Sequence, residues 1–318
     1  MPVYALERRC LMRYLCVGLS VIASLIMISN IITFVRLLIN LNKKSYIDKM
    51  FNHWNYKLCL LMMLIFLPVY IAVSFVYFTN RNINLTAINL MIIIAFFGCS
   101  VFVKAIIFNM SQMLSAIENK KNETIIALVN AEEAKDFYTR GHSLHVCLII
   151  LKFYERLPDD LRSKTSKTIL EESAILHDIG KIGITDSVLN KPGKLTEEEY
   201  ALIKKHPRYG ATILKDTGYK NIADIIYNHH ERIDGNGYYG VPDEKIPLES
   251  KMIAIADTFS ALTTNRIYRP QKSVDEAIYI IQEEAGTQFD PQLVNIFCSI
   301  DQIELEDTEK ELKLKLTR

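Results

Sequence analysis

The apolar residues of this chain are concentrated before about residue 110, where they form three long runs without a charged side chain. The runs cover residues 14–35, 58–80 and 82–103, and each contains 22 or 23 residues. A helix rises about 1.5 Å per residue, so each run is long enough to cross a hydrocarbon core of about 30 Å. The pattern predicts a membrane domain over residues 1–108 with about three transmembrane helices.

The charges between these runs predict how the helices are oriented. Residues 36–57 carry five basic residues and one acidic residue, Asp48, whereas Arg81 is the only charge between the second and third runs. The positive-inside rule then places the first loop and everything after the third run in the cytoplasm. We therefore expect a multi-pass protein of the inner (cytoplasmic) membrane. Three arginines before the first run would lie outside, and a first helix that does not fully insert is the alternative. The short external loops leave open whether this domain senses a signal or is a plain anchor.

A connecting helix is predicted over residues 109–135, where neither glycine nor proline occurs. Its apolar and small residues recur at spacings near 3.5, with Lys121 interrupting the pattern. The helix is expected either to join two protomers as a parallel coiled coil, giving a homodimer, or to pack alone on the next domain. The positions that define the repeat are Met110, Leu114, Ile117, Thr124, Leu128 and Ala131.

Residues 136–300 show helical periodicity throughout, with apolar residues three and four positions apart and no sustained two-residue alternation. Thr196 followed by Glu199 is typical of a capping box, and Asp290-Pro291 of a helix start. The fold class is therefore all-α: N-terminal transmembrane helices followed by a helical bundle. Residues 301–318 are expected to form a C-terminal tail, a frayed helix without an assigned function. The periodic segments are 146–157, 169–177, 198–205, 222–230, 252–262 and 274–284.

Composition narrows the class of protein. The 318 residues suit two domains, and the net charge of +1 gives no general attraction for a nucleic-acid polymer. Six cysteines occur without a CxxC pair, so neither a disulfide framework nor a zinc–thiolate site is expected.

Histidines and aspartates at helix ends predict a metal site. His177-Asp178 and His229-His230 each follow an apolar helical segment, and Asp257 interrupts a run that otherwise belongs in the core. A buried unpaired carboxylate would cost several kcal/mol, so Asp257 needs a partner or a cation. Two further histidines, His142 and His206, bring the candidate ligands to five imidazoles and two carboxylates without a thiolate. Such a set suits iron or manganese, with zinc as an alternative. The set exceeds one ion's needs, so we expect two divalent ions sharing Asp178, as in two-metal phosphoester hydrolysis.

At these residues the chain resembles the HD-GYP family, a branch of the HD-domain phosphohydrolases, over about residues 134–297. The resemblance implies an HD-type helical bundle at residues 136–300. It is carried by Tyr138-Thr139-Arg140-Gly141-His142-Ser143, His177-Asp178-Ile179-Gly180-Lys181, Lys191-Pro192-Gly193, His206-Pro207, His229-His230-Glu231-Arg232, Asp234-Gly235-Asn236-Gly237-Tyr238, Ala256-Asp257, Arg266-Ile267-Tyr268-Arg269 and Gly286-Thr287-Gln288-Phe289-Asp290-Pro291.

The resemblance also implies a complete set of metal ligands. One ion would be held by His142, His177, Asp178 and Asp257, and the other by Asp178, His206, His229 and His230. Some members bind a third ion through a glutamate that corresponds to Tyr138 here, so a binuclear site is expected.

Two positions depart from the family pattern. Tyr239 replaces the proline of the Gly-Tyr-Pro signature, which is expected to loosen the loop without removing a ligand. His145 stands where many members have arginine, and we expect it at the surface or behind the ligands rather than on a metal.

Members of this family hydrolyse cyclic di-GMP to linear pGpG and in some cases to GMP. The resemblance implies that Asp178 and Lys181 are catalytic, with Lys181 contacting the scissile phosphate or assisting proton transfer. Arg266, Arg269 and Tyr238 are candidates for substrate binding, with surface salt bridges as the alternative for the two arginines. Two other functions stay open: hydrolysis of another cyclic dinucleotide or nucleotide, and a weakly catalytic nucleotide-binding module.

Overall fold

The computed structural model describes residues 2–42, 53–79, 87–136, 141–264 and 270–316. Within these ranges the chain is helical and contains no strand, only an isolated bridge between Ala285 and Phe289. The all-α prediction is therefore confirmed for the described part. Two stretches singled out from the sequence lie outside it: residues 138–140, which include Tyr138, and residues 266–269, which include Arg266 and Arg269.

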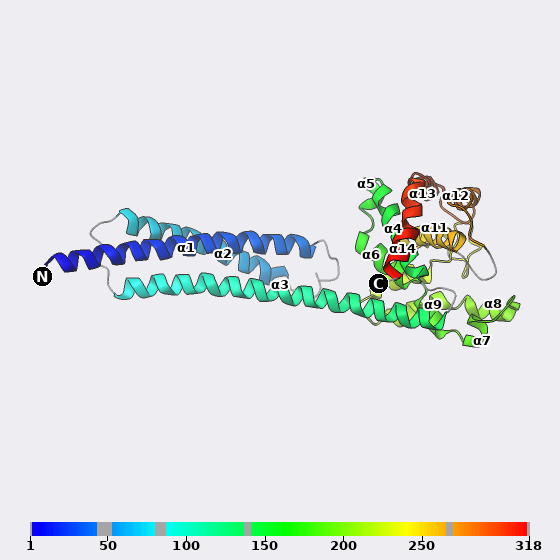
Figure 1. Cartoon of the computed structure of the whole chain (residues 1–318), viewed down its shortest axis with the longest axis horizontal. Helices are drawn as coiled ribbons and strands as arrows, with labels where there is room; N and C mark the ends of the chain where they lie inside the picture. The colour runs from blue at the N-terminus through cyan, green and yellow to red at the C-terminus, as the bar shows by residue number, and fades with distance from the viewer. Residues whose placement is uncertain (1, 43–52, 80–86, 137–140, 265–269, 317–318) are drawn as a thin grey trace. The chain divides into compact units, whose positions relative to one another are not determined.

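The chain divides into two units, Met1–Lys120 and Lys121–Arg318, and the division falls inside the long helix α3 (Ala87–Lys135) (Figure 1). The first unit also contains α1 (Pro2–Asn42) and α2 (His53–Thr79). Two helical segments, Tyr14–Arg36 and Ile93–Lys135, are long and apolar enough to cross a membrane, and Met63–Val76 of α2 is a shorter apolar segment. Length and composition do not by themselves separate such helices from a core helix or a signal sequence.

Polar and apolar side chains of the first unit are distributed unlike those of a soluble bundle. Many large apolar side chains are exposed, including Phe75 and Phe102, each at 65%. Polar side chains are instead buried between the helices, where Ser74 donates to Ser20 (2.9 Å) and Asn30 donates to the carbonyl of Ser100 (3.0 Å). A water-soluble bundle normally shows the reverse arrangement.

The second unit is built from short helices and two 3-10 segments. They are α4 (His142–Arg156), α5 (Asp159–Arg162), α6 (Lys167–Leu176), η2 (Ile179–Gly183), α7 (Asp186–Leu189), α8 (Glu197–Ile203), α9 (His206–Leu214), α10 (Lys220–Tyr227), η3 (Asp243–Lys245), α11 (Leu248–Thr263), α12 (Val274–Glu283), α13 (Pro291–Cys298) and α14 (Gln302–Leu316).

Helices α4, α6, α10 and α11 form the centre of the hydrophobic core. Their apolar residues recur every three or four positions, so each helix turns one stripe inward. Phe153 of α4 and Phe259 of α11 both meet Phe297 of α13 edge to face, with ring centroids 5.3 and 5.4 Å apart. The core fixes the helices whose ends and faces carry the histidines and aspartates.

Both helix starts predicted from the sequence occur. Thr196 accepts a hydrogen bond from the backbone N–H of Glu199 (3.2 Å), and Glu199 accepts one from the backbone of Thr196 (2.8 Å). Asp290 caps α13 by accepting from the backbone of Gln292 (2.8 Å).

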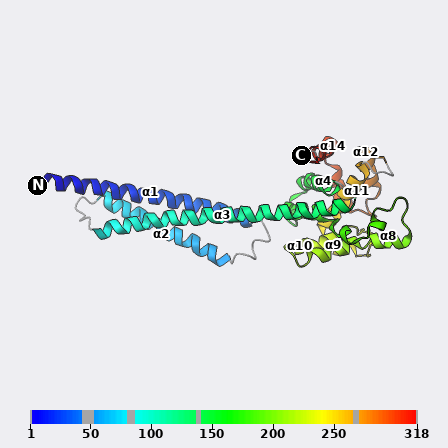
Figure 2. The ribbon, with the colours of Figure 1, turned by 60° about the horizontal axis from the view of Figure 1, so that its bottom comes forward.

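The segment expected as a frayed tail forms α14, which packs on α4 (Figure 2). Leu305, Thr308 and Leu312 are buried, while the charged residues between them face outward. The alternation of leucine with charge that looked like fraying therefore marks an amphipathic helix with one face in the core.

Candidate metal centre

The seven predicted metal ligands come from helix ends and from one helix interior. His142 and His206 are the first residues of α4 and α9, and His177 ends α6 directly before Asp178. His229 and His230 follow the end of α10, and Asp257 lies within α11. The structure gathers them into two groups, each with ligand atoms within 4.8 Å of one another: Asp178, His206, His229 and His230 in one, and His142, His177 and Asp257 in the other.

Asp178 adjoins both groups. One of its carboxylate oxygens lies 3.1 Å from Nε2 of His206, and the other lies 3.3 Å from Nε2 of His177. A carboxylate can offer one oxygen to each of two cations. The geometry therefore fits the shared ligand that the sequence predicts.

Close backbone packing brings Asp178 next to His206. A Cβ on Gly180 would lie 1.9 Å from the carbonyl oxygen of His206 and 2.4 Å from the backbone nitrogen of Gly210. Only glycine allows η2 to approach α9 this closely.

Three of the histidines are oriented by the last turn of the helix that precedes them. His177, His206 and His229 each donate from Nδ1 to the carbonyl three residues earlier, at 2.7, 2.8 and 2.6 Å. This fixes Nδ1 as the protonated nitrogen and leaves the Nε2 lone pair of each neutral ring available to a metal.

The Nε2 atoms that face into the site fit a cation. Nε2 of His177 is buried and makes no well-aligned hydrogen bond, although an oxygen of Asp178 lies 3.3 Å away. Nε2 of His206 and Nε2 of His229 face each other at 3.3 Å although both Nδ1 atoms already carry a proton. Two facing lone pairs repel each other unless a proton or a metal ion lies between them. Imidazoles and carboxylates of this kind suit divalent transition metals.

Charge within the site favours the ligating forms of most of these residues. Burial opposes ionisation of Asp178 and Asp257, but Lys181 and His177 hold the pKa of Asp178 well below its usual value, and His142 does the same for Asp257. Burial lowers the pKa of His230 to about 3 and that of His229 well below its usual value, so both are neutral at pH 7.

His177 is the exception. Burial opposes its charge, but Asp178 raises the pKa of His177 to about 9. The site therefore favours a positive charge at this ring, and a metal ion there would take the place of a proton.

Lys181 lies beside Asp178 in η2, with its amine 2.7 Å from that carboxylate and 3.1 Å from Asp136. Burial disfavours its charge, but the two carboxylates raise the pKa of Lys181 above its usual value. Asp136, directly after α3, and buried Glu132, in its last turn, were not identified from the sequence. In the sequence, only their four-residue spacing, which places both carboxylates on one face of a helix, could have indicated that they act together.

Glu132 is expected to make stability depend on pH. Burial, and next the charge of Asp178, raise the pKa of Glu132 from 4.5 to about 8. Between these values the folded protein holds a proton more tightly than the unfolded chain, so stability falls as pH rises, by at most about 1.4 kcal/mol per pH unit. Glu132→Gln removes the titrating group and therefore this fall in stability with rising pH. The metal-free variant should melt above the metal-free wild type at pH 8 and close to it at pH 5. Equal melting temperatures at both pH values would contradict the assignment.

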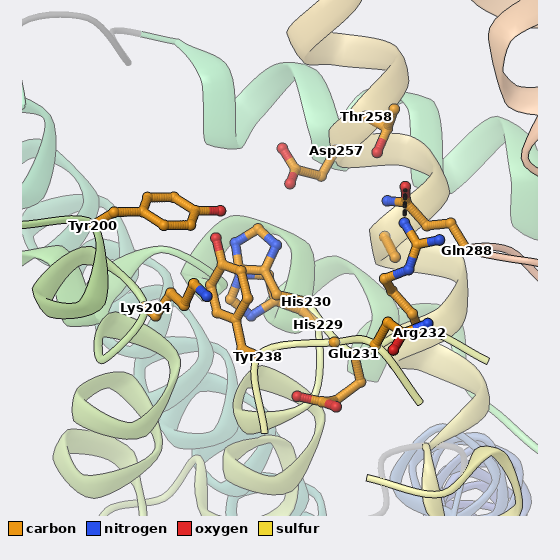
Figure 3. Close-up of a pocket in the computed structure, with 13 residues that line it drawn as sticks. Tyr200, Lys204, His229, His230, Glu231, Arg232, Tyr238, Asp257, Thr258 and Gln288 are labelled. Atoms are coloured by element: carbon orange, nitrogen blue, oxygen red, sulfur yellow. Dashed lines mark hydrogen bonds between the residues drawn. The ribbon is translucent and has the colours of Figure 1, made fainter. Parts of the chain in front are cut away.

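A cavity of about 350 Å³ opens beside the site and is lined by His229, His230 and Asp257 (Figure 3). Tyr238, a predicted substrate residue, also lines it, with its ring 4.5 Å from that of His230. Tyr200 and Lys204 form the neighbouring wall, with the amine of Lys204 4.8 Å from the centre of the Tyr200 ring. Nothing in the sequence singled out these last two residues.

Tyr239, which was expected to loosen its loop by replacing proline, makes contacts that oppose such loosening. Its backbone N–H donates to Glu231 (2.8 Å), a bond that proline cannot make. Its ring stacks on Tyr227 with centroids 4.6 Å apart, and its hydroxyl donates to the carbonyl of Lys204 (2.8 Å). Tyr239 thus anchors the loop that carries Tyr238.

His145 is not at the surface, which was one of its two expected positions. It is 1% exposed and contacts the hydroxyls of Ser260 and Thr308. Burial, and next the charge of His142, lower the pKa of His145 to about 4, so its ring is neutral at pH 7.

The fold and the site define a helical domain with a histidine–aspartate centre suited to divalent metal ions. A family model described as "HD domain" matches residues 120–293, and the chain belongs to this family.

Three curated relatives each match half of this chain or more. A protein of Vibrio cholerae named "Cyclic di-GMP phosphodiesterase" is 38% identical over 213 residues, which cover 60% of this chain and 43% of that protein. The "Cyclic di-GMP phosphodiesterase response regulator RpfG" of Xanthomonas campestris is 38% identical over 189 residues (57% and 48%). The "3'3'-cGAMP-specific phosphodiesterase 3" of Vibrio cholerae is 38% identical over 162 residues (50% and 35%). The chain thus spans less than half the length of these relatives.

Proposed function

We propose that this protein is a metal-dependent phosphodiesterase that hydrolyses cyclic di-GMP to pGpG, to GMP or to both, in bacterial second-messenger signalling. The position of Asp178 between two groups of histidines carries this proposal. Relatives named for the same activity support it.

Two metal ions account for the donor set. His142, His177, Asp178 and Asp257 would hold one, and Asp178, His206, His229 and His230 the other. Nitrogen-rich ligation without thiolates favours iron or manganese. When bound, the ions would supply Lewis-acid activation of the phosphate and of the attacking water.

Lys181 would stabilise negative charge on the phosphate undergoing attack. The carboxylates of Asp178 and Asp136 raise its pKa, so it holds its proton more firmly than an ordinary lysine. A general acid works best with a pKa near the working pH. Of the two roles open to Lys181, electrostatic stabilisation is therefore favoured over proton donation.

The cavity beside the site supports a nucleotide substrate. Tyr238 could stack on a base, and Arg266 and Arg269 are suited by their chemistry to the second phosphate or to a guanine edge. The relative named for 3'3'-cGAMP makes that dinucleotide the second candidate substrate.

A direct assay separates these functions. The purified full chain, loaded with manganese or with iron(II) under anaerobic conditions, is incubated with cyclic di-GMP or with 3'3'-cGAMP. Linear products are then quantified by chromatography. We expect cyclic di-GMP to be hydrolysed at least about tenfold faster, which corresponds to about 1.4 kcal/mol in transition-state binding. Faster hydrolysis of 3'3'-cGAMP would support the second substrate, and binding without any product would support a nucleotide-binding module.

Membrane attachment is proposed for the first unit because its large apolar side chains face outward and its polar ones are hydrogen-bonded inside. Residues 1–108 would anchor the protein in the inner membrane, residues 109–135 would connect the anchor to a cytoplasmic catalytic domain, and two such helices could pair in a homodimer. Retention of the protein in alkali-washed membranes would support the anchor, and release into the supernatant would reject it.

A further inference from the structure

His142 is oriented differently from the other histidines near it. His177, His206 and His229 each use Nδ1 to donate to a backbone carbonyl three residues earlier, whereas the Nδ1 of His142, at the start of α4, contacts a side chain. Its Nδ1 instead lies 3.0 Å from the hydroxyl of Ser260, while its Nε2 lies 2.9 Å from Asp257.

Ser260 belongs to a series of hydrogen bonds that ends in α14. Its hydroxyl lies 2.9 Å from Nδ1 of His145, and Nε2 of His145 lies 3.2 Å from the hydroxyl of Thr308. Thr308 in turn donates to the carbonyl of Leu305 at 2.5 Å. Ser260 is fully buried, and His145 and Thr308 are each 1% exposed, so solvent has little access to the series.

The carbonyl at the end of this series sets the direction of every bond. A carbonyl only accepts, so the Thr308 hydroxyl donates to it and accepts from Nε2–H of His145. A neutral imidazole carries one N–H, so Nδ1 of His145 accepts from the hydroxyl of Ser260. The Ser260 oxygen then accepts from Nδ1–H of His142. His142 therefore carries a proton on Nδ1, which leaves its Nε2, facing Asp257, as the nitrogen available to a metal ion.

We propose that Ser260, His145 and Thr308 are positioning residues that hold His142 in its ligating tautomer, which makes α14 part of the support of one metal site. The inference rests on the metal-binding role proposed for His142. It gives functions to two features that the sequence left without one: the histidine at position 145 and the segment after residue 300.

The effect is expected at one metal site only. In the other group, His206 and His229 are oriented by backbone carbonyls, and among the described residues neither ring hydrogen-bonds to this series. Loss of a hydrogen bond behind a metal ligand typically weakens binding about 10- to 100-fold. Ser260→Ala should therefore lower the affinity for one of the two ions by about this factor and leave the affinity for the other within about twofold of wild type. Thr308→Val, which keeps the shape of the side chain, should lower the affinity for the same ion by a smaller factor.

Metal titration of the full chain tests this. Cobalt(II) is titrated into metal-free wild type, Ser260→Ala, Thr308→Val and the matched control Thr308→Ser, with absorbance and bound metal measured and folding checked by circular dichroism. Site-selective weakening in the first two variants, with the control like wild type, supports the proposal. Wild-type affinity for both ions in folded Ser260→Ala overturns it, as does equal weakening of both. Wild-type behaviour of Thr308→Val alone overturns the part assigned to α14.

A measurement on the unmutated protein covers the case in which a variant does not fold. Nitrogen-15 NMR of histidine-labelled, metal-free wild type should show a proton on Nδ1 of His142. An unprotonated Nδ1 would overturn the proposal. Neither experiment uses a substrate, so a wild type that binds two ions yet hydrolyses no cyclic dinucleotide would reject the proposed function alone. A wild type that binds no ion would reject both.

Discussion

Replacing Asp178 with asparagine is expected to reduce phosphodiesterase activity on the order of a thousandfold or more, because two-metal hydrolysis needs both ions in place. The carboxylate lies 3.1 Å from His206 and 3.3 Å from His177, so its loss affects both ligand groups. Asparagine keeps the shape but offers one neutral oxygen. The measurement is kcat with manganese, together with the number of ions bound per chain.

Asp216→Asn is the matched control, since Asp216 is exposed and belongs to neither ligand group. It should keep wild-type activity and metal content. An Asp178→Asn protein that binds two ions and keeps a tenth of the activity would show that Asp178 is not the shared ligand.

Lys181→Met is expected to lower kcat by about 100- to 1,000-fold while both ions stay bound, since removing one preorganised charge at a transition state has an effect of this size. The amine approaches Asp178 at 2.7 Å, so the site would lose its nearest fixed positive charge among the described residues. Activity with cyclic di-GMP and bound metal are measured on the same preparation.

Lys181→Arg separates charge from proton transfer. Arginine keeps the positive charge and does not release a proton near neutral pH. We expect it to recover at least about a tenth of the activity if the lysine acts by charge. An arginine variant as inactive as Lys181→Met would instead favour proton donation. Loss of metal in the methionine variant would assign Lys181 to holding Asp178 in place.

The helical class of the described residues and both predicted caps followed from the sequence because they depend on local spacing. Apolar stripes and the Thr196–Glu199 box are each determined within a few residues. A metal site was also expected, because His177-Asp178 and His229-His230 each stand where a helix ends, whereas the division of its ligands into two sets was implied by the resemblance to the HD-GYP family.

Contacts between distant segments could not be predicted in this way. Asp136 meets Lys181 across 45 positions, and His145 meets Thr308 across 163. Tyr239 was expected to loosen its loop because only the lost rigidity of proline is visible in the sequence. Its stacking on Tyr227 depends on the folded arrangement. The segment that forms α14 looks polar as a sequence because only one side of this helix is buried.

The absence of a side chain at Gly180 has a consequence for how precisely the centre is built. Two stretches of main chain touch there, so the separation between the backbones that carry Asp178 and His206 is set by peptide groups rather than by adjustable rotamers. Main-chain contacts of this kind do not relax as a flexible side chain can. The spacing of the centre is therefore insensitive to substitutions elsewhere on these segments and intolerant of even one added methyl group at this position.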